Sequence, residues 1–262
     1  MFKLLKKICD CDIMPIKYRN SNLYLEEKIY MIKKYFEDWN KFELSFLICG
    51  LLASVLSSII FKGTVIDTLY TSLYLITALL MSKGKVECYF VGFVSVFFYG
   101  IISYNQGYYG ELIITAFLTF PIMIIGIIEW LKHQDREDDT VIINSLSKKE
   151  ITIALLSQLI LFWAYYFLLK AFNTDLLVIS SISVVTSVLA SYFEARRSEW
   201  SLFCYIANDL VIITLWLIPI IKGQTELLSV LLGPILLLIN DIYGSYNWKR
   251  LKKQQKKKGI SQ

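Results

Sequence analysis

Long apolar runs separated by short polar segments divide this chain into eight stretches, at approximately 44–61, 64–81, 86–104, 109–131, 151–170, 174–193, 199–221 and 225–247. About 20 apolar residues in a helix cross the hydrocarbon core of a bilayer, which is roughly 30 Å thick. Each run therefore predicts one transmembrane helix. The polar segments are too short for a soluble domain, so the pattern predicts an all-α integral membrane protein with about eight spans.

The composition supports this class, because 56% of the residues are hydrophobic and only 19% are charged, with a mean hydropathy of +0.53. Basic residues indicate the orientation, since Lys and Arg are retained on the cytoplasmic side of a membrane. With the N-terminus inside, the inner segments hold 24 of the 27 basic residues and the outer loops hold 3. We therefore predict a protein of the cell inner (cytoplasmic) membrane with both termini in the cytoplasm.

Both ends of the chain are basic. We interpret residues 1–43 and the tail 248–262 as cytoplasmic segments that lie against anionic membrane lipid rather than nucleic acid. Apolar residues at helical spacing predict an interfacial helix over residues 23–42. The five cysteines form no disulfide framework, and the single histidine, His133, has no cluster of zinc ligands around it. No metal and no cofactor are predicted.

Two of the predicted spans close with the same motif, Gly-x-x-x-Trp followed by basic residues. The motif occurs at Gly126–Lys132 and again at Gly244–Arg250, at an offset of 118 residues. Its tryptophans, Trp130 and Trp248, lie near span ends, where aromatic residues often form a belt at the membrane surface. We predict that role for both.

The repeated motif predicts an extra first helix followed by a core of three plus one plus three helices. The segments are the extra helix 44–61, the first triplet 64–131, the linking helix 151–170 and the second triplet 174–247. Pro121 and Pro234 interrupt the closing spans at an offset of 113 residues, so we expect a small insertion between the copies. The linking helix makes the repeat parallel, and parallel repeats hold a transported substrate near the midplane between the two halves.

Polar side chains inside the spans are the candidates for substrate contact. Asn208 and Asp209 lie roughly 13 Å into the seventh span at about 1.5 Å per residue, close to the midplane. Asn240 and Asp241 form a similar pair in the eighth span, and Gln158 lies in the linking helix. Intramembrane polar groups mark substrate pathways by default. Hydrogen bonding between helices is the alternative explanation for each Asn and Gln.

Successive helical residues point about 100° apart, so Asn208 and Asp209 cannot both aim squarely at one cavity. We expect one of them to contact substrate and the other to hold a neighbouring helix. Asn208 shares a broad face with Trp200, whereas Trp216 points nearer to Asp209. Because an aromatic ring beside an amide suits a ligand with a flat ring, we favour Asn208 as the substrate contact.

No catalytic machinery is recognisable in the chain. The GKV sequence at Gly84 lacks the other residues of a phosphate-binding loop, so no coupling to nucleotide hydrolysis is predicted. No paired carboxylates occur together with a histidine, and we predict that the protein is not an enzyme. Proton coupling through Asp209 or Asp241 is a weaker hypothesis, because no histidine or lysine accompanies them in their spans.

The order and spacing of several longer stretches resemble a known family. They are GKVECYFVGFVSVFFYGIISYNQGYYGE, FPIMIIGIIEWLKH, RRSEWSLFCYIANDLVIITLW and YGSYNW, and the resemblance covers roughly residues 64–250. They resemble the PnuC family of vitamin transporters, most closely its nicotinamide riboside members. The resemblance implies a seven-span core related to the SWEET sugar transporters and assembly as a homotrimer. It also implies facilitated diffusion of nicotinamide riboside, which cytoplasmic phosphorylation traps for NAD synthesis.

The resemblance also bears on the site. Together with the span positions, it suggests the substrate-binding residues Asn208, Trp200, Phe203, Asn240, Asp241, Asp209, Trp216 and Gln158. Phe203 stands where the family's Trp-x-x-Trp has its second tryptophan, and Met123 and Asp241 stand where an amide is often found. These departures leave thiamine, riboflavin or a deoxynucleoside as alternative substrates. A substrate-binding membrane subunit that needs an energising partner is the alternative class.

Overall fold

The structure is a computed structural model, and it describes residues 30, 33, 35–60, 64–105, 115–135, 138–172, 176–223 and 228–260. These residues form helices joined by turns and connecting segments, with one isolated bridge between Gln134 and Val141. The predicted all-α class is confirmed for these ranges. The chain divides into two compact units, Met1–Ile48 and Cys49–Gln262.

Every predicted span corresponds to a helix. In chain order the helices are α3 (Lys41–Ile60), α4 (Val65–Ser82), α5 (Glu87–Asn105), the π-helical turn η2 (Thr115–Thr119), α7 (Phe120–Lys132), α8 (Lys148–Ala171), α9 (Leu177–Ala195), α10 (Trp200–Ile221) and α11 (Leu228–Lys257). Six spans, α3, α4, η2 with α7, α8, α9 and α10, are long and apolar enough to cross a membrane. α5 has a shorter apolar stretch, and α11 continues past the predicted span as far as Lys257.

In the first unit, the described residues surround the start of α3. The rings of Trp39 and Phe36 pack with their centroids 4.8 Å apart. Asn40 and Glu43 each accept a hydrogen bond from the other's backbone N–H, both at 2.9 Å, and this reciprocal cap starts the helix. Half of the residues of the interfacial helix predicted over residues 23–42 lie outside the described residues.

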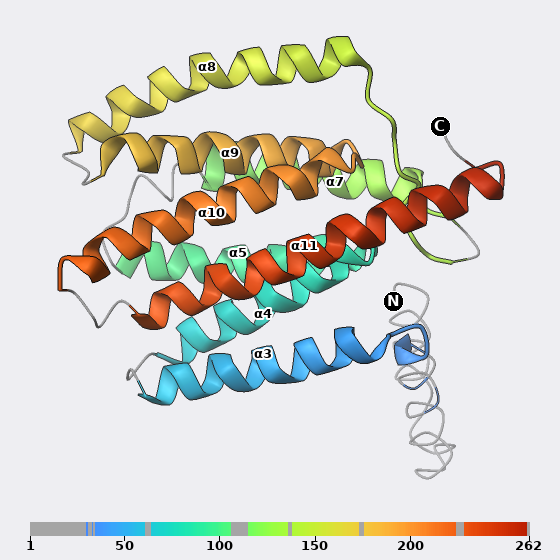
Figure 1. The fold of residues 1–262 in the computed structure, drawn as a ribbon, viewed down its shortest axis with the longest axis horizontal. Coiled ribbons are helices and arrows are strands. Elements are labelled where there is room, and N and C mark those ends of the chain that lie inside the picture. Colours follow the sequence, from blue (N-terminus) through green and yellow to red (C-terminus); the bar gives the residue numbers. More distant parts are fainter. Residues whose placement is uncertain are drawn as a thin grey trace, which may run out of the picture. The chain divides into compact units, whose positions relative to one another are not determined.

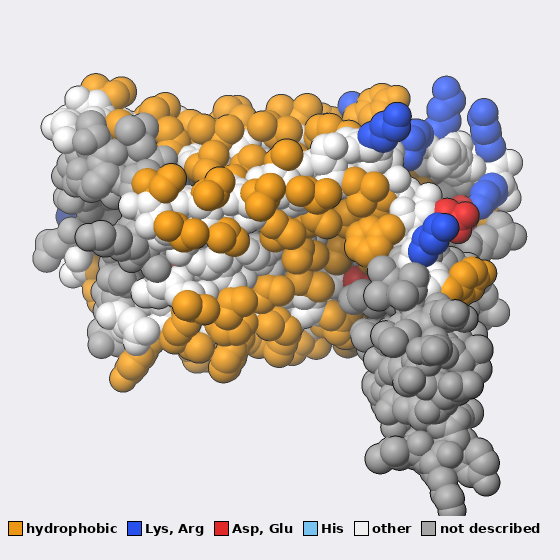
Figure 2. Space-filling model, turned by 90° about the horizontal axis from the view of Figure 1, so that it is seen from below, with side chains coloured by type: hydrophobic (Ala, Val, Ile, Leu, Met, Phe, Trp, Pro, Cys, Tyr) orange, Lys and Arg blue, Asp and Glu red, His pale blue; other side chains and the backbone are white. Residues whose placement is uncertain are grey.

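In the second unit, α4, α7, α9 and α11 run in one direction and α5, α8 and α10 in the other (Figure 1). α4 packs against α5 and α11, α10 packs against α9 and α11, α7 packs against α9, and α8 flanks α9. We call the end at which α4, α7, α9 and α11 finish the basic end, because Lys83, Lys132, Arg196 and Arg250 lie there, and the opposite end the far end. Figure 2 shows Lys and Arg side chains gathered at one end and hydrophobic side chains along the body.

Two turns at the basic end share one backbone conformation. The turn from α4 to α5 contains Gly84 with φ +68°, and the turn from α9 to α10 contains Arg197 with φ +60°. These residues are 113 positions apart, as are the first residues of α5 and α10, Glu87 and Trp200. Glycine adopts the left-handed region freely, whereas for arginine it costs about 1–2 kcal/mol.

The two motif tryptophans make reciprocal contacts at the basic end. The indole N–H of Trp130 on α7 donates to the carbonyl of Glu194 on α9 at 2.8 Å. The indole N–H of Trp248 on α11 donates to the carbonyl of Met81 on α4 at 2.9 Å. Both side chains are fully buried, with their rings 5.7 Å apart. The prediction of an interfacial belt role was therefore wrong, because each indole finds its hydrogen-bond acceptor at the end of a neighbouring helix.

The motif glycines allow equally close packing. A Cβ atom at Gly126 would overlap the ring of Tyr89 on α5, and a Cβ atom at Gly244 would overlap Ser82 on α4 and crowd Leu202 on α10. Tyr89 and Leu202 are again 113 positions apart. Each motif therefore closes its helix against the helix that precedes it in the chain.

Pro121 and Pro234 do not lie at matching distances from the motif tryptophans. Pro121 lies 9 residues before Trp130, whereas Pro234 lies 14 residues before Trp248. Both intervals are continuous helix, so the prolines differ in depth by about 7.5 Å at 1.5 Å per residue. Pro121 begins α7 after the π-helical turn, but α11 runs through Pro234. The offset is 113 at the turns and 118 at the motif, so the second copy has five additional residues between them, and the position of the expected small insertion stays a prediction.

Candidate functional site

A cavity of about 760 Å³ lies among α3, α4, α5, α9, α10 and α11, and we call it the central cavity. It extends from Asp67, in the first turn of α4 at the far end, to Glu194, in the last turn of α9 at the basic end. Its volume is within the range of about 300–1,000 Å³ that is usual for small-molecule sites.

One wall of the cavity is aromatic. Tyr70 and Tyr74 lie one turn apart on α4, with ring centroids 5.8 Å apart and planes 21° apart. Tyr99 of α5 packs on Tyr70 at 5.3 Å. Trp216 and Tyr205 of α10 also line the cavity. These ring faces can stack on a flat aromatic ligand.

Four carboxyl groups line the same cavity, those of Asp67, Glu194, Asp209 and Asp241. Asp67 caps α4, where its carboxylate accepts hydrogen bonds from the backbone N–H and the hydroxyl of Thr64. Glu194 accepts a hydrogen bond of 2.6 Å from the hydroxyl of Tyr205. Three of the four carboxyl groups therefore come from the chain after α8.

Asp209 of α10 and Asp241 of α11 lie next to each other in the cavity lining. Their carboxyl groups are close enough to interact directly with each other. Asp241 also accepts a hydrogen bond of 3.0 Å from the amide of Asn240. Within the described part of the chain, nothing donates a hydrogen bond to the second carboxyl oxygen of Asp209, although the side chain is only 3% exposed.

Asn208 lines the cavity and also holds a neighbouring helix. Its amide oxygen accepts a hydrogen bond of 2.8 Å from the hydroxyl of Thr186, with Ser183 at 3.5 Å, and both partners lie on α9. Asp209, the next residue, lines the cavity as well. Sequence reasoning expected one of the two to face the cavity and the other to hold a helix, but Asn208 does both.

The second pair does divide its roles. Asn240 is fully buried, and its amide nitrogen lies 3.0 Å from the carbonyl of Ala78 and 2.9 Å from the hydroxyl of Ser82. These contacts hold α11 against α4, and Asn240 does not line the cavity. Its neighbour Asp241 does, as expected from side chains that point about 100° apart.

Three other predicted site residues lie outside the central cavity. Trp200 and Phe203 are 47% and 39% exposed, and their rings pack on each other at 5.8 Å. Lys249 places its ammonium group 4.8 Å from the centre of the Phe203 ring. Gln158 on α8 donates a hydrogen bond to the carbonyl of Ala154 in its own helix. Of the eight predicted residues, the cavity therefore brings together Asn208, Asp209, Trp216 and Asp241.

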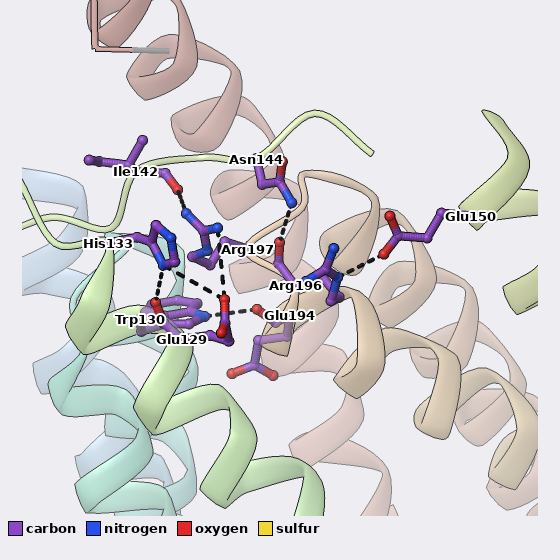
Figure 3. Close-up of polar contacts among 9 residues, drawn as sticks. All are labelled: Glu129, Trp130, His133, Ile142, Asn144, Glu150, Glu194, Arg196 and Arg197. Carbon is purple, nitrogen blue, oxygen red and sulfur yellow. Dashed lines mark hydrogen bonds and ion pairs between the residues drawn. The ribbon is translucent and has the colours of Figure 1, made fainter. Parts of the chain in front are cut away.

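At the basic end, a cluster of polar side chains and backbone groups joins the ends of α7 and α9 and the start of α8 (Figure 3). The Arg197 guanidinium donates to the carbonyl of Ile142 at 3.0 Å and lies 3.9 Å from the carboxylate of Glu129. Burial lowers the pKa of Arg197. Arg196 pairs with Glu150 at 2.7 Å, and this hydrogen bond raises the pKa of Arg196.

Figure 3 also shows how Glu194 connects this cluster to the cavity. Its backbone carbonyl accepts the Trp130 N–H, while its side chain points away from the arginines. That side chain lines the cavity, so the polar cluster fixes the backbone that carries one of the four carboxyl groups.

The contribution of α4 was missed by sequence reasoning. Its cavity residues are Asp67, Thr68, Tyr70, Thr71, Tyr74, Leu75, Thr77, Ala78 and Met81. Their spacing of three and four residues marks one helical face. Toward the far end of α4, the residues of this face are polar or aromatic. That periodic stripe was readable in the sequence, but a search for isolated carboxylates and amides near the midplane overlooks tyrosine and threonine.

Comparison with known proteins gives consistent matches. Residues 64–250 match the family model described as nicotinamide mononucleotide transporter. The nicotinamide riboside transporter PnuC of Neisseria mucosa is 23% identical over 228 residues, covering 85% of this chain and 86% of that protein. The protein of the same name from Haemophilus influenzae is 21% identical, covering 85% and 96%.

The fold also matches a solved structure. The crystal structure of the vitamin B3 transporter PnuC superposes with a TM-score of 0.71 at 22% identity, and the match covers 85% of this chain and 96% of that one. The similarity extends over nearly the whole helical core described above.

Proposed function

This chain belongs to the nicotinamide mononucleotide transporter family, and from that premise we propose that it carries nicotinamide riboside across a membrane through the central cavity. The family and its solved relative are transporters, not enzymes. The observation that carries the proposal is a cavity of suitable volume that combines stacked tyrosine rings with amide and carboxyl groups.

The chemistry of nicotinamide riboside matches this lining. The substrate has a flat, positively charged ring with a carboxamide, joined to a ribose with several hydroxyl groups. Tyr70 and Tyr74 offer ring faces for stacking, and Trp216 offers a third. Asn208, Asp209 and Asp241 offer hydrogen-bonding groups for the carboxamide or the ribose. We propose these residues as the substrate contacts, whereas Trp200, Phe203, Asn240 and Gln158 lie outside this cavity.

We further propose facilitated diffusion by a parallel repeat of α4–α7 and α9–α11, joined by α8. The reciprocal bonds of Trp130 and Trp248 and the matching turns at Gly84 and Arg197 support an equivalence of the two triplets. In parallel repeats, rocking of one half against the other exposes a central site alternately to each side. Phosphorylation of the vitamin by a separate cytoplasmic enzyme then traps it for NAD synthesis.

The proposed setting is the cell inner (cytoplasmic) membrane, with the basic end and both termini in the cytoplasm. The distribution of Lys and Arg supports this orientation. Homotrimeric assembly is proposed from the family resemblance, and the exposed apolar side chains along the body suit contact with lipid or with another copy.

Uptake into proteoliposomes tests the proposed function. Purified protein should equilibrate radiolabelled nicotinamide riboside across the bilayer without nucleotide or an ion gradient. Uptake of thiamine, riboflavin or a deoxynucleoside in place of nicotinamide riboside would assign the chain to another vitamin. Binding without equilibration would indicate a substrate-binding subunit that needs an energising partner.

A further inference from the structure

The ionisable side chains that line the central cavity in the described ranges are acidic groups and tyrosines. Four carboxyl groups line it, and the described part of its lining contains no lysine, arginine or histidine. Asp209 and Asp241 lie beside each other, and Glu194 is close enough to Asp241 to interact with it electrostatically. A cavity with low-dielectric walls and one sign of charge concentrates the field of that charge. A cation therefore gains more than a neutral molecule of the same shape by entering.

The three inner carboxyl groups differ in their partners. Glu194 accepts a hydrogen bond from Tyr205, and Asp241 accepts one from Asn240. Asp209 is nine-tenths or more buried, lines the cavity and keeps one carboxyl oxygen for which the described residues provide no donor. A buried acceptor without a partner is costly, and a bound ligand can supply what is missing.

We propose that Asp209, supported by Asp241, is the counter-charge that makes this transporter select a flat-ring monocation over its neutral analogue. The proposal rests on the proposed function and deepens it by assigning charge selection to two residues. Asp209 contacts the positive ring or a group attached to it. Asp241, which interacts with Asp209 through a hydrogen bond, and Glu194 place further acidic groups beside it. The tyrosine faces of α4 add a cation–π contribution that a neutral ring does not gain.

A metal ion is not the occupant that this arrangement suits. Across the described ranges, no three His, Cys, Asp or Glu side chains converge as ligands for a metal ion. The cavity also contains hydroxyl groups and the amide of Asn208, but aromatic rings form one wall, and divalent cations such as calcium take six to eight oxygens. An organic cation with a delocalised charge matches rings and a few carboxyl groups better.

The test compares two forms of one molecule. Nicotinamide riboside carries a positive ring, and its reduced dihydro form has the same substituents with a neutral ring. Isothermal calorimetry on the purified wild-type protein should give a Kd for the oxidised form that is lower by roughly 30-fold or more. Equal affinity for both forms would overturn the proposal without affecting the proposed function, whereas no binding of either form would count against both.

Variants assign the effect to residues. Asp209→Asn keeps the size of the side chain and should reduce the preference for the oxidised form to less than about threefold, mainly by weakening its binding. Asp241→Asn should reduce the preference by a smaller factor. Glu199→Gln is the matched control, because Glu199 precedes the same helix, pairs with Lys252 and does not line the cavity. It should keep the wild-type preference.

The possible outcomes remain informative if a variant is unstable. Size-exclusion profiles and thermal transitions without ligand identify a variant that fails to fold, and the wild-type comparison then stands by itself. A folded Asp209→Asn protein with an unchanged preference would refute the assignment to Asp209. Thiamine, a second flat-ring cation, should compete with oxidised nicotinamide riboside more strongly than the neutral riboflavin does.

Discussion

Helix α4 brings Tyr70, Tyr74 and Thr77 to the central cavity, whereas α10 and α11 bring Asp209 and Asp241. The two groups of helices share features at the basic end, where the turns after α4 and α9 have the same left-handed residue. Their cavity faces nevertheless differ in balance. α4 presents two stacked rings, hydroxyl groups and one carboxyl group, whereas α10 and α11 present two neighbouring carboxyl groups together with Trp216 and Tyr205. Turns with similar backbone geometry thus precede helices that form two different walls of one cavity.

The turns from α4 to α5 and from α9 to α10 also share a backbone conformation but differ in their side chains. Gly84 and Arg197 both have a left-handed φ, +68° and +60°. Gly84 accepts a hydrogen bond from the backbone N–H of Val141 at 2.8 Å, and Arg197 accepts one from Asn144 at 2.9 Å. The loop between α7 and α8 therefore contacts both turns. In the second turn the Arg197 side chain adds the contact to Ile142, which helps to offset the less favourable backbone.

The largest expected effect concerns the reciprocal tryptophans. Trp130→Ala and Trp248→Ala should each lower the free energy of unfolding by about 3–5 kcal/mol, because each removes a fully buried indole and its hydrogen bond. Denaturant titration in mixed micelles measures the change. Trp200→Ala is the control and should cost much less, since Trp200 is half-exposed. A large loss at only one motif tryptophan would contradict the equivalence of the two halves.

The motif glycines should show a smaller effect of the same kind. Gly126→Ala and Gly244→Ala each place a Cβ atom against a neighbouring helix and should cost about 1–3 kcal/mol of stability. Gly233→Ala in α11 has nothing within 4 Å of its new Cβ atom and should be neutral or stabilising by up to about 1 kcal/mol. The same titration measures all three. Equal effects at Gly233 and Gly244 would show that helix propensity, not close packing, sets the values.

The smallest expected effect concerns the aromatic half of the cavity. Tyr74→Leu should weaken nicotinamide riboside binding about 2–10-fold by removing one stacking face, while Tyr74→Phe should stay close to wild type. Calorimetry on purified protein gives both values. Tyr246→Leu, at an exposed tyrosine on α11 outside the cavity, serves as the control. If Tyr74→Phe binds as weakly as Tyr74→Leu, the hydroxyl group rather than the ring face makes the contact.

Sequence reasoning located the spans well, since each of the eight apolar runs overlaps a helix, although α11 continues ten residues past the predicted end at 247. It located the site only in part. Asn208 and Asp209 were found because a carboxylate among apolar residues is conspicuous. Tyr70 and Tyr74 were not found, because tyrosine is common in membrane helices and its spacing on α4 has meaning only once α4 is known to face a cavity.

The sequence indicated how far along its helix each side chain lies, but it did not indicate which other helix covers that side chain. Trp130 and Trp248 lie near the ends of their helices, as expected, yet they are buried because other helix ends cover them. Asn240 and Asn208 each precede an aspartate in an apolar helix. The amide of Asn240 hydrogen-bonds to α4, whereas Asn208 lines the cavity. Burial depends on which helix lies opposite, and that is a long-range property.

The sequence by itself determined the membrane class, the approximate positions of the helices and the clustering of positive charge, because each depends on local composition and on the length needed to cross a bilayer. The tertiary structure alone decided which polar groups meet. Asp209 and Asp241 are 32 positions apart, and Tyr74 lies more than 130 positions before either. Only the packing of α10 against α11 and of α4 against α11 brings rings and carboxyl groups around one cavity.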